Sequence, residues 1–172
     1  GFHTLMPYYA AMAKDGTVWA GLQDNGNLKI DPTDHKQYET FGGDGFFAAV
    51  DPNKSSTAYE EYTNGAISVT TDGGTSWASI DPKLTASKFS NPFTMDPTDA
   101  NHLVTGGREV VETLKGPNTT GGQTPAGSRS SWRKPAGTGC MSASSTTRPG
   151  GRCPAGSISR RPRGFPTSRM AT

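Results

Sequence analysis

The stretch Ser68–Trp77, SVTTDGGTSW, decides the fold that we expect for this chain. It places an aspartate, two glycines, several hydroxyl side chains and a tryptophan next to one another. Asp72 can accept hydrogen bonds from backbone N–H groups further along the turn, and the glycines allow conformations that a Cβ atom would forbid. The stretch therefore predicts a tight turn between two strands, in which Asp72 is structural rather than catalytic.

Short strand-like segments surround this turn up to about residue 115. They are rich in β-branched and aromatic residues and are separated by Gly, Asn, Asp and Pro. The pairs Asn25–Gly26 and Asn64–Gly65 predict hairpins, because both central residues of a type I′ turn need a positive φ. The expected strands lie at 16–22, 27–30, 46–51, 57–63, 66–71, 76–80, 93–96 and 102–107.

The chain also repeats itself. Asp51-Pro52 and Asp96-Pro97 lie 45 residues apart, and each pair ends an apolar strand that is followed by a polar turn and a second strand. Such a period with four short strands is typical of a propeller blade. We expect an all-β chain, a partial β-propeller of two to three four-stranded antiparallel blades, with one full blade at about 41–80 and partial blades on both sides. Open blade surfaces and strand edges would make such a fragment poorly stable or prone to aggregation.

The turn residues also carry a resemblance to a known family. Thr70, Asp72, Gly74, Ser76 and Trp77 match the pattern Ser/Thr-x-Asp-x-Gly-x-Ser/Thr-Trp, which resembles the Asp-box or BNR repeat of sialidase-like, glycosyl-hydrolase-like and sortilin-type propellers. In that family the motif joins the third and fourth strands of a blade, away from the active site. The resemblance implies a secreted, glycosidase-like protein, extracellular or periplasmic in its full-length form.

Candidate site residues follow from this blade assignment. The loop that enters the innermost strand and the hairpins between second and third strands open on the top face, and here they are 22–26, 41–45, 63–65 and 106–110. Asp44, which lies between glycines, and Asp24 are the candidate catalytic acids, since two carboxylates about 5–10 Å apart can hydrolyse a glycoside. Either could instead only stabilise its turn. The candidate binding residues are Gln23, Asn25, Asn64 and Arg108.

Whether the chain belongs to an enzyme stays open. Sialidase-like sites hold a sugar carboxylate with several arginines, and Arg108 is the sole arginine before residue 116. The alternatives are a non-enzymatic propeller that binds a protein or peptide at the same loops, and a non-functional truncated gene product. We expect no cofactor and no metal, because His3, His35 and His102 lack metal-ligand spacing and no phosphate-binding motif occurs. The sequence contains no run of 18 apolar residues, so it predicts no membrane-spanning helix.

Residues 116–172 differ sharply in composition from the residues before them. They carry 9 Lys and Arg and no acid, whereas residues 1–115 carry 8 Lys and Arg against 15 acids. A segment rich in Gly, Pro, Ser and Thr buries little apolar area, so we expect disorder. For residues 116–172 we favour a shifted reading frame over a genuine tail. A linker to another domain is the third alternative. Nucleic acid or another anionic partner, and a pairing of Cys140 with Cys153, are expected only if the tail is genuine.

Overall fold

The computed structural model describes residues 5–121 and 130–136, which all belong to one compact unit, Gly1–Cys140. These residues form three antiparallel sheets. The strands are β1 (Pro7–Met12), β2 (Val18–Leu22), β3 (Gly26–Ile30) and β4 (Gln37–Phe41); β5 (Ala48–Val50), β6 (Ala58–Glu61), β7 (Ile67–Thr70) and β8 (Ala78–Ser79); and β9 (Phe93–Asp96), β10 (Asp99–Gly106) and β11 (Val110–Thr113). Two 3-10 helices, η1 (Thr63–Gly65) and η2 (Gly116–Asn118), complete the described elements, and neither is long and apolar enough to cross a membrane.

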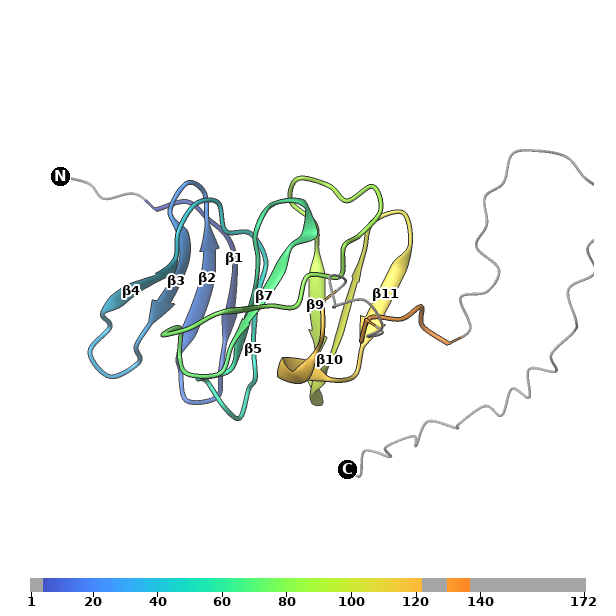
Figure 1. The fold of residues 1–172 in the computed structure, drawn as a ribbon. Coiled ribbons are helices and arrows are strands. Elements are labelled where there is room, and N and C mark those ends of the chain that lie inside the picture. Colours follow the sequence, from blue (N-terminus) through green and yellow to red (C-terminus); the bar gives the residue numbers. More distant parts are fainter. Residues whose placement is uncertain (1–4, 122–129, 137–172) are drawn as a thin grey trace, which may run out of the picture. The chain divides into compact units, whose positions relative to one another are not determined.

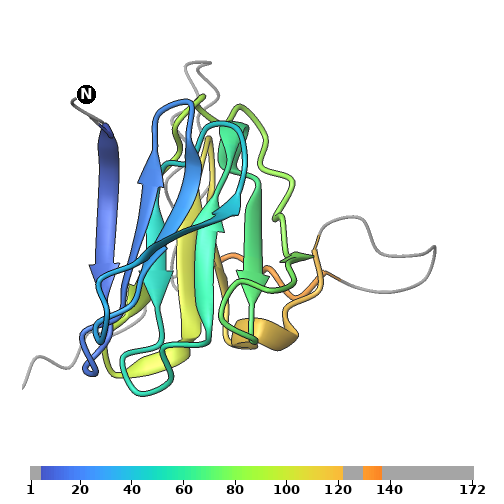
Figure 2. The ribbon, with the colours of Figure 1, turned by 90° about the vertical axis from the view of Figure 1, so that its left-hand side faces the viewer.

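Each sheet is a meander, in which strands that are consecutive in sequence are paired in space. The three sheets follow one another from left to right in Figure 1, while in Figure 2 they lie one behind another. The first strands of the sheets, β1, β5 and β9, line a common groove. The prediction of an all-β chain is therefore confirmed, and the expected strands correspond to β2, β3 and β5–β10.

The middle sheet is covered on both faces, and this explains its sequence. On β6, Ala58 packs with Trp19 and Val50 towards the first sheet, whereas Tyr59 packs with Leu103 towards the third sheet. A sheet that is buried on both faces needs apolar residues at consecutive positions rather than at alternate ones. The run FFAAV at 46–50 accordingly shows no alternation of polar and apolar residues.

The first and second sheets approach each other closely at two glycines. A Cβ atom at Gly21 would overlap the backbone of Phe46, and one at Gly45 would overlap the carbonyl oxygen of Gly26. The Gly45 N–H also donates to the carbonyl oxygen of Leu22 at 2.9 Å. This close contact holds the 42–47 loop against the hairpin between β2 and β3, where two of the candidate acids lie.

The two Asn-Gly hairpins differ in geometry. Between β6 and β7, Asn64 has φ 62° and Gly65 has φ 76°, as a type I′ turn requires. Between β2 and β3 the positive φ values belong to Asp24 (58°) and Gly26 (62°) and not to Asn25. The type I′ expectation is wrong there, because three residues separate the strands and Asp24 takes the left-handed position.

The first sheet is a complete four-stranded sheet rather than the partial blade that we expected. Its strands β1 and β4 were not expected from the sequence, and neither was β11 in the third sheet. The sequence PYYAAM of β1 begins with proline, and QYETF of β4 is largely polar. Both form strands because their backbones pair with β2 and β3, so tertiary pairing overrides weak local propensity.

The packed part of the chain extends past residue 115. Arg133 pairs with Glu112 through two backbone hydrogen bonds of 2.7 and 2.9 Å. Trp132 is buried, and its Nε1–H donates to the carbonyl oxygen of Ile80 at 2.6 Å. The packed residues therefore extend past the boundary expected at residue 115, and one large aromatic side chain and a short strand pairing anchor residues 132 and 133. Residues 122–129 and 137–172, with Cys140 and Cys153, lie outside the described residues.

Candidate functional site

The turn between β7 and β8 is held together by the Asp72 carboxylate. Asp72 Oδ1 accepts from the Thr70 hydroxyl at 2.8 Å and from the Ser76 N–H at 2.9 Å, and Oδ2 accepts from the Ser76 hydroxyl at 2.5 Å. Hydrogen bonds from Ser76, followed by that from Thr70, lower the pKa of Asp72 to about 2. Both carboxylate oxygens are engaged by hydrogen bonds within the turn.

The other positions of the turn motif pack the second sheet against the first. Gly74 has φ 94°, and a Cβ atom there would overlap the side chain of Thr40. Trp77 meets Trp19 of β2 edge to face, with ring centroids 5.9 Å apart. Because this turn lies at the lower end of the sheets, next to the turn at 51–57, it is remote from the predicted site.

The predicted top-face segments do lie at one end of the described sheets, the upper end in Figure 1. The hairpins at 22–26, 63–65 and 106–110 and the loop at 42–47 all connect strands at this end. Asp24 and Asp44 meet there, because the Asp44 carboxylate accepts a hydrogen bond from the Asp24 N–H at 3.1 Å. Asp44 thus stabilises the turn in which Asp24 has a positive φ.

The predicted binding residues are spread along this upper end. Asn25 donates its side-chain amide to the carbonyl oxygen of Gln23 at 2.8 Å, so both belong to the hairpin that contains Asp24. Asn64 and Arg108 are exposed in the hairpins of the second and third sheets. Their backbone N–H groups bond to the loop between β8 and β9, at Phe89 and Thr85 respectively. Gln23 and Asn25 therefore share the hairpin of Asp24, whereas Asn64 and Arg108 bond to the loop between β8 and β9.

Aromatic side chains at the upper end were not expected from the sequence. Tyr8 stacks on Phe46 with ring centroids 5.0 Å apart, and Phe46 meets Phe89 edge to face at 5.3 Å. On the other side of the same backbone segments, Tyr9 and Phe47 lie 5.1 Å apart. The doublets YY at 8–9 and FF at 46–47 were the available signal, since neighbouring strand residues point to opposite faces.

Two adjacent glutamates on β6 are buried between the sheets. Glu61 Oε1 accepts from the N–H groups of Gly65 at 3.1 Å and Asn91 at 3.0 Å, and burial raises its pKa to about 7. Glu60 lies beside Asn27, and burial raises its pKa well above the ordinary value. Neither carboxyl has a salt bridge within the described residues. Charged residues in the middle of a predicted strand were the signal, but sequence alone could not show burial on both faces.

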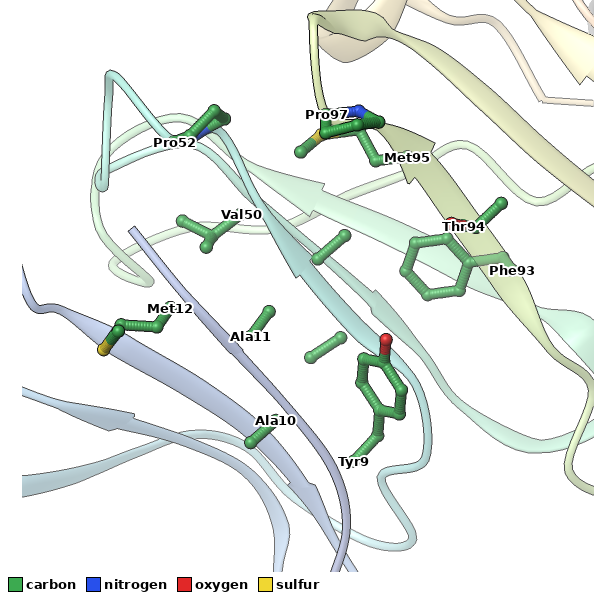
Figure 3. Close-up of a pocket in the computed structure, with 12 residues that line it drawn as sticks. Tyr9, Ala10, Ala11, Met12, Val50, Pro52, Phe93, Thr94, Met95 and Pro97 are labelled. Carbon is green, nitrogen blue, oxygen red and sulfur yellow. The ribbon is translucent and has the colours of Figure 1, made fainter. Parts of the chain in front are cut away.

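A groove runs between the first strands of the three sheets. One part of it, about 250 Å³ in volume, lies among β1, β5 and β9, and in Figure 3 Tyr9 extends across it towards Phe93 and Thr94. A second part of about 480 Å³ shares Tyr9, Phe93 and Thr94 and adds Phe47 and the start of the hairpin at 106–110. No charged side chain lines either part.

The described residues contain no cluster of three or more His, Cys, Asp and Glu side chains that could hold a metal ion. His102 illustrates why, because its two ring nitrogens face different acids. Nδ1 lies 3.6 Å from Asp96 and Nε2 lies 3.1 Å from Glu112, so the three residues form a row across the third sheet. Their side chains face one another in pairs and do not converge on a common point.

The sheet arrangement is similar to that of a solved enzyme. The GH74 xyloglucanase from Xanthomonas campestris matches 70% of this chain with a TM-score of 0.54 and 19% sequence identity. The fold is a partial β-propeller. The chain spans 22% of the length of that enzyme. No family model matches the chain, and no curated protein is similar to it in sequence. The relation to Asp-box and sialidase-like proteins therefore stays a prediction.

Proposed function

We propose that this chain is part of a secreted, carbohydrate-active propeller that binds its ligand at the upper end of the sheets. The observation that carries this proposal is the contact between Asp24 and Asp44 at this end, two residues before Phe46, on which the exposed ring of Tyr8 stacks. Loops held at one end of a rigid scaffold are common ligand sites. The similarity in fold to a xyloglucanase supports the assignment to carbohydrate chemistry.

Asp24 is the residue of this chain that would act if the whole protein hydrolyses a glycoside, together with a second carboxyl group from the rest of that protein. The Asp24 side chain is exposed and free to face a ligand, whereas Asp44 is half-buried and bound to the Asp24 backbone. We therefore assign Asp24 the role of proton donor or nucleophile and Asp44 the role of holding its turn in place. This reverses the order of importance expected from the sequence, where Asp44 came first.

Asparagine variants of the two acids test this assignment. Asp24→Asn removes the charge of the exposed acid, so we expect loss of hydrolysis with retained binding of oligosaccharides. Asp44→Asn keeps an oxygen acceptor for the Asp24 N–H and should reduce activity only in part. Asp34→Asn, in the exposed turn between β3 and β4, is the matched control and should leave activity and binding unchanged. Full activity of Asp24→Asn would contradict the catalytic assignment.

A non-enzymatic propeller that binds a peptide is the second candidate. The groove between the first strands favours it, because apolar and aromatic side chains line the groove and no paired acids do. An extended peptide can bind along such strands through its backbone. Binding of peptides but not of oligosaccharides to the folded chain would favour this candidate over the glycosidase-like one.

A further inference from the structure

We propose that the loop at 81–92 is a strap across the upper end of the sheets, which Glu61 and Asn91 hold closed and which opens as the pH rises towards neutrality. The loop connects β8 to β9, contains no helix or strand and lies at the upper end in Figure 1. Within it, Asn91 alone is buried. The proposal goes beyond the proposed function, because it does not depend on which ligand the upper end binds.

The strap contacts three neighbouring segments at the upper end. The Asn64 N–H of the second sheet donates to the carbonyl oxygen of Phe89 at 2.8 Å. The Arg108 N–H of the third sheet donates to the carbonyl oxygen of Thr85 at 3.1 Å. The Phe89 ring meets Phe46 edge to face, with centroids 5.3 Å apart. The strap therefore reaches the loop that carries one of the candidate acids, and its opening would change access to this end.

Glu61 and Asn91 hold the strap to the sheets. Glu61 Oε1 accepts from the N–H groups of Gly65 at 3.1 Å and Asn91 at 3.0 Å. The Asn91 side chain donates to the Thr105 hydroxyl at 3.2 Å and accepts from the Lys88 N–H at 3.2 Å. One buried residue of the strap is thus bound to both β6 and β10. A segment with so few buried groups can open without unfolding of the sheets.

Ionisation of Glu61 favours the open strap. The side chain is fully buried, and its Oε2 has no hydrogen-bond partner within the described residues. Burial therefore raises the pKa of Glu61 from 4.5 to about 7. When the strap lifts, water can reach Oε2 and the pKa returns towards its ordinary value. The closed strap is fully stabilised below about pH 4.5 and loses this stabilisation as the pH rises through 7.

Among the described residues, no second charged group faces Glu61. Asp81 and Lys83 of the strap pair with each other, and Glu60 faces the first sheet, beside Asn27. Burial and backbone N–H groups therefore set the pKa of Glu61. The other charged side chains of the strap and of the hairpin at 106–110 are exposed: Lys88, Arg108 and Glu109.

Hydrogen exchange measured by NMR on the full 172-residue chain tests the proposal. The strap amides are the N–H groups of Asn64, Arg108 and Asn91. After correction for the intrinsic pH dependence of exchange, they should open on the order of 50-fold more at pH 7.5 than at pH 5, the change that the two pKa values imply. The Gly45 N–H, which donates to Leu22 away from the strap, should change much less.

Three variants separate the contributions. Glu61→Gln keeps an oxygen for both N–H groups and cannot ionise, so it should remove the pH dependence. Glu39→Gln is the matched control, because Glu39 is exposed on β4, and it should retain the pH dependence. Asn91→Ala loses both side-chain hydrogen bonds but keeps its backbone N–H, so it should raise the exchange of the other two strap amides at both pH values.

Equal opening of the strap amides at pH 5 and pH 7.5 in the unaltered chain would overturn the proposal. A pH dependence that persists in Glu61→Gln would overturn it as well. An equal change at the strap amides and at Gly45 would show that Glu61 acts on the stability of the whole fold and that no strap opens. None of these measurements uses a ligand, so any of these results leaves the proposed function standing. Failure of the asparagine variants to affect hydrolysis would leave the strap standing.

Discussion

At the scale of single residues, three acids of this chain lie in three different environments. Asp72 is exposed, yet its oxygens are engaged by Thr70 and Ser76. Glu61 is buried with two backbone donors on one oxygen, and Asp24 is exposed in a strained turn. Hydrogen bonds to an ionised carboxylate lower its pKa, whereas burial raises it. The same chemical group therefore stabilises a turn, titrates near neutrality or faces solvent according to its neighbours.

Asp72→Ala should loosen the turn between β7 and β8. The folded state holds the pKa of Asp72 at about 2, below its ordinary value of 3.8, so its stabilising effect is present above pH 4 and is lost as the pH falls towards 2. We expect faster exchange of the Ser76 and Gly74 amides at pH 7, measured by NMR, with Thr33→Ala as the control. Equal exchange in Asp72→Ala and the unaltered chain would show that the carboxylate does not hold the turn.

Glu61→Gln should make the stability of the chain less dependent on pH. Because burial raises the pKa of Glu61 from 4.5 to about 7 in the folded state, the folded state binds more protons than the unfolded state between these values. Stability therefore falls as the pH rises through this window, by on the order of 2 kcal/mol. Glutamine keeps an oxygen for the Gly65 and Asn91 N–H groups and cannot ionise. Urea unfolding at pH 5 and pH 8 should give a smaller difference for Glu61→Gln than for the unaltered chain; the same difference would contradict a buried, titrating Glu61.

At the scale of elements, the second and third sheets have similar interactions beside their third strands. In each, a tryptophan precedes a residue that pairs with the third strand, Trp77 before Ala78 and Trp132 before Arg133. In the third sheet the Thr120 and Ser131 hydroxyls bond to each other at 2.9 Å, and in the second sheet the Asp72 carboxylate bonds to the Ser76 hydroxyl. In both sheets the tryptophan packs towards the preceding sheet, Trp77 on Trp19 and Trp132 on Ile80.

Trp132→Ala should destabilise the third sheet strongly. The side chain is buried and its Nε1–H bonds to Ile80, and truncation of a buried tryptophan costs about 3–5 kcal/mol. Trp132→Phe keeps most of the buried area and loses the hydrogen bond, so it should cost less. Arg133→Ala is the control, because its exposed side chain contributes little and its backbone pairing remains. Denaturant unfolding measures all three, and a Trp132→Ala chain as stable as Arg133→Ala would contradict the anchoring role.

At the scale of the whole molecule, the described sheets leave large apolar side chains in contact with solvent. Met12 on β1 is 70% exposed, Met6 is 54% exposed and Phe89 is 59% exposed. Several of them lie on β1 or next to it, the strand that begins the first sheet. Exposed apolar surface of this kind drives association of chains. The fold is therefore compatible with the expectation that the chain alone tends to aggregate.

Met12→Lys should reduce association of the chain. A charge in place of an exposed apolar side chain disfavours contact between copies, so light scattering after size-exclusion chromatography should show a smaller mean mass at high concentration. Thr33→Lys adds the same charge in the exposed turn between β3 and β4, and it should have a smaller effect. A monomeric unaltered chain that unfolds cooperatively at neutral pH would refute the expectation.

The sequence by itself determined the local features of this protein. The strand-turn pattern, the hairpins at 22–26 and 63–65 and the hydrogen-bonded turn at Asp72 all depend on residues close together in the chain, and hydrophobic pattern and turn chemistry report such features directly. The upper-end position of Asp24 and Asp44 also followed, once strands were grouped into blades. Only the contact between them needed the structure.

Only the tertiary structure decided what depends on residues far apart in the chain. The strands β1 and β4 exist because β2 and β3 pair with them. Glu61 is buried because the loop at 81–92 covers it, and Trp132 becomes part of the core through Ile80, which lies 52 residues earlier. The uncharged groove forms because three separate strands meet there. Packing between distant segments decides which residues are buried and which side chains lie together. The pattern of residues along the sequence does not show which segments pack against each other.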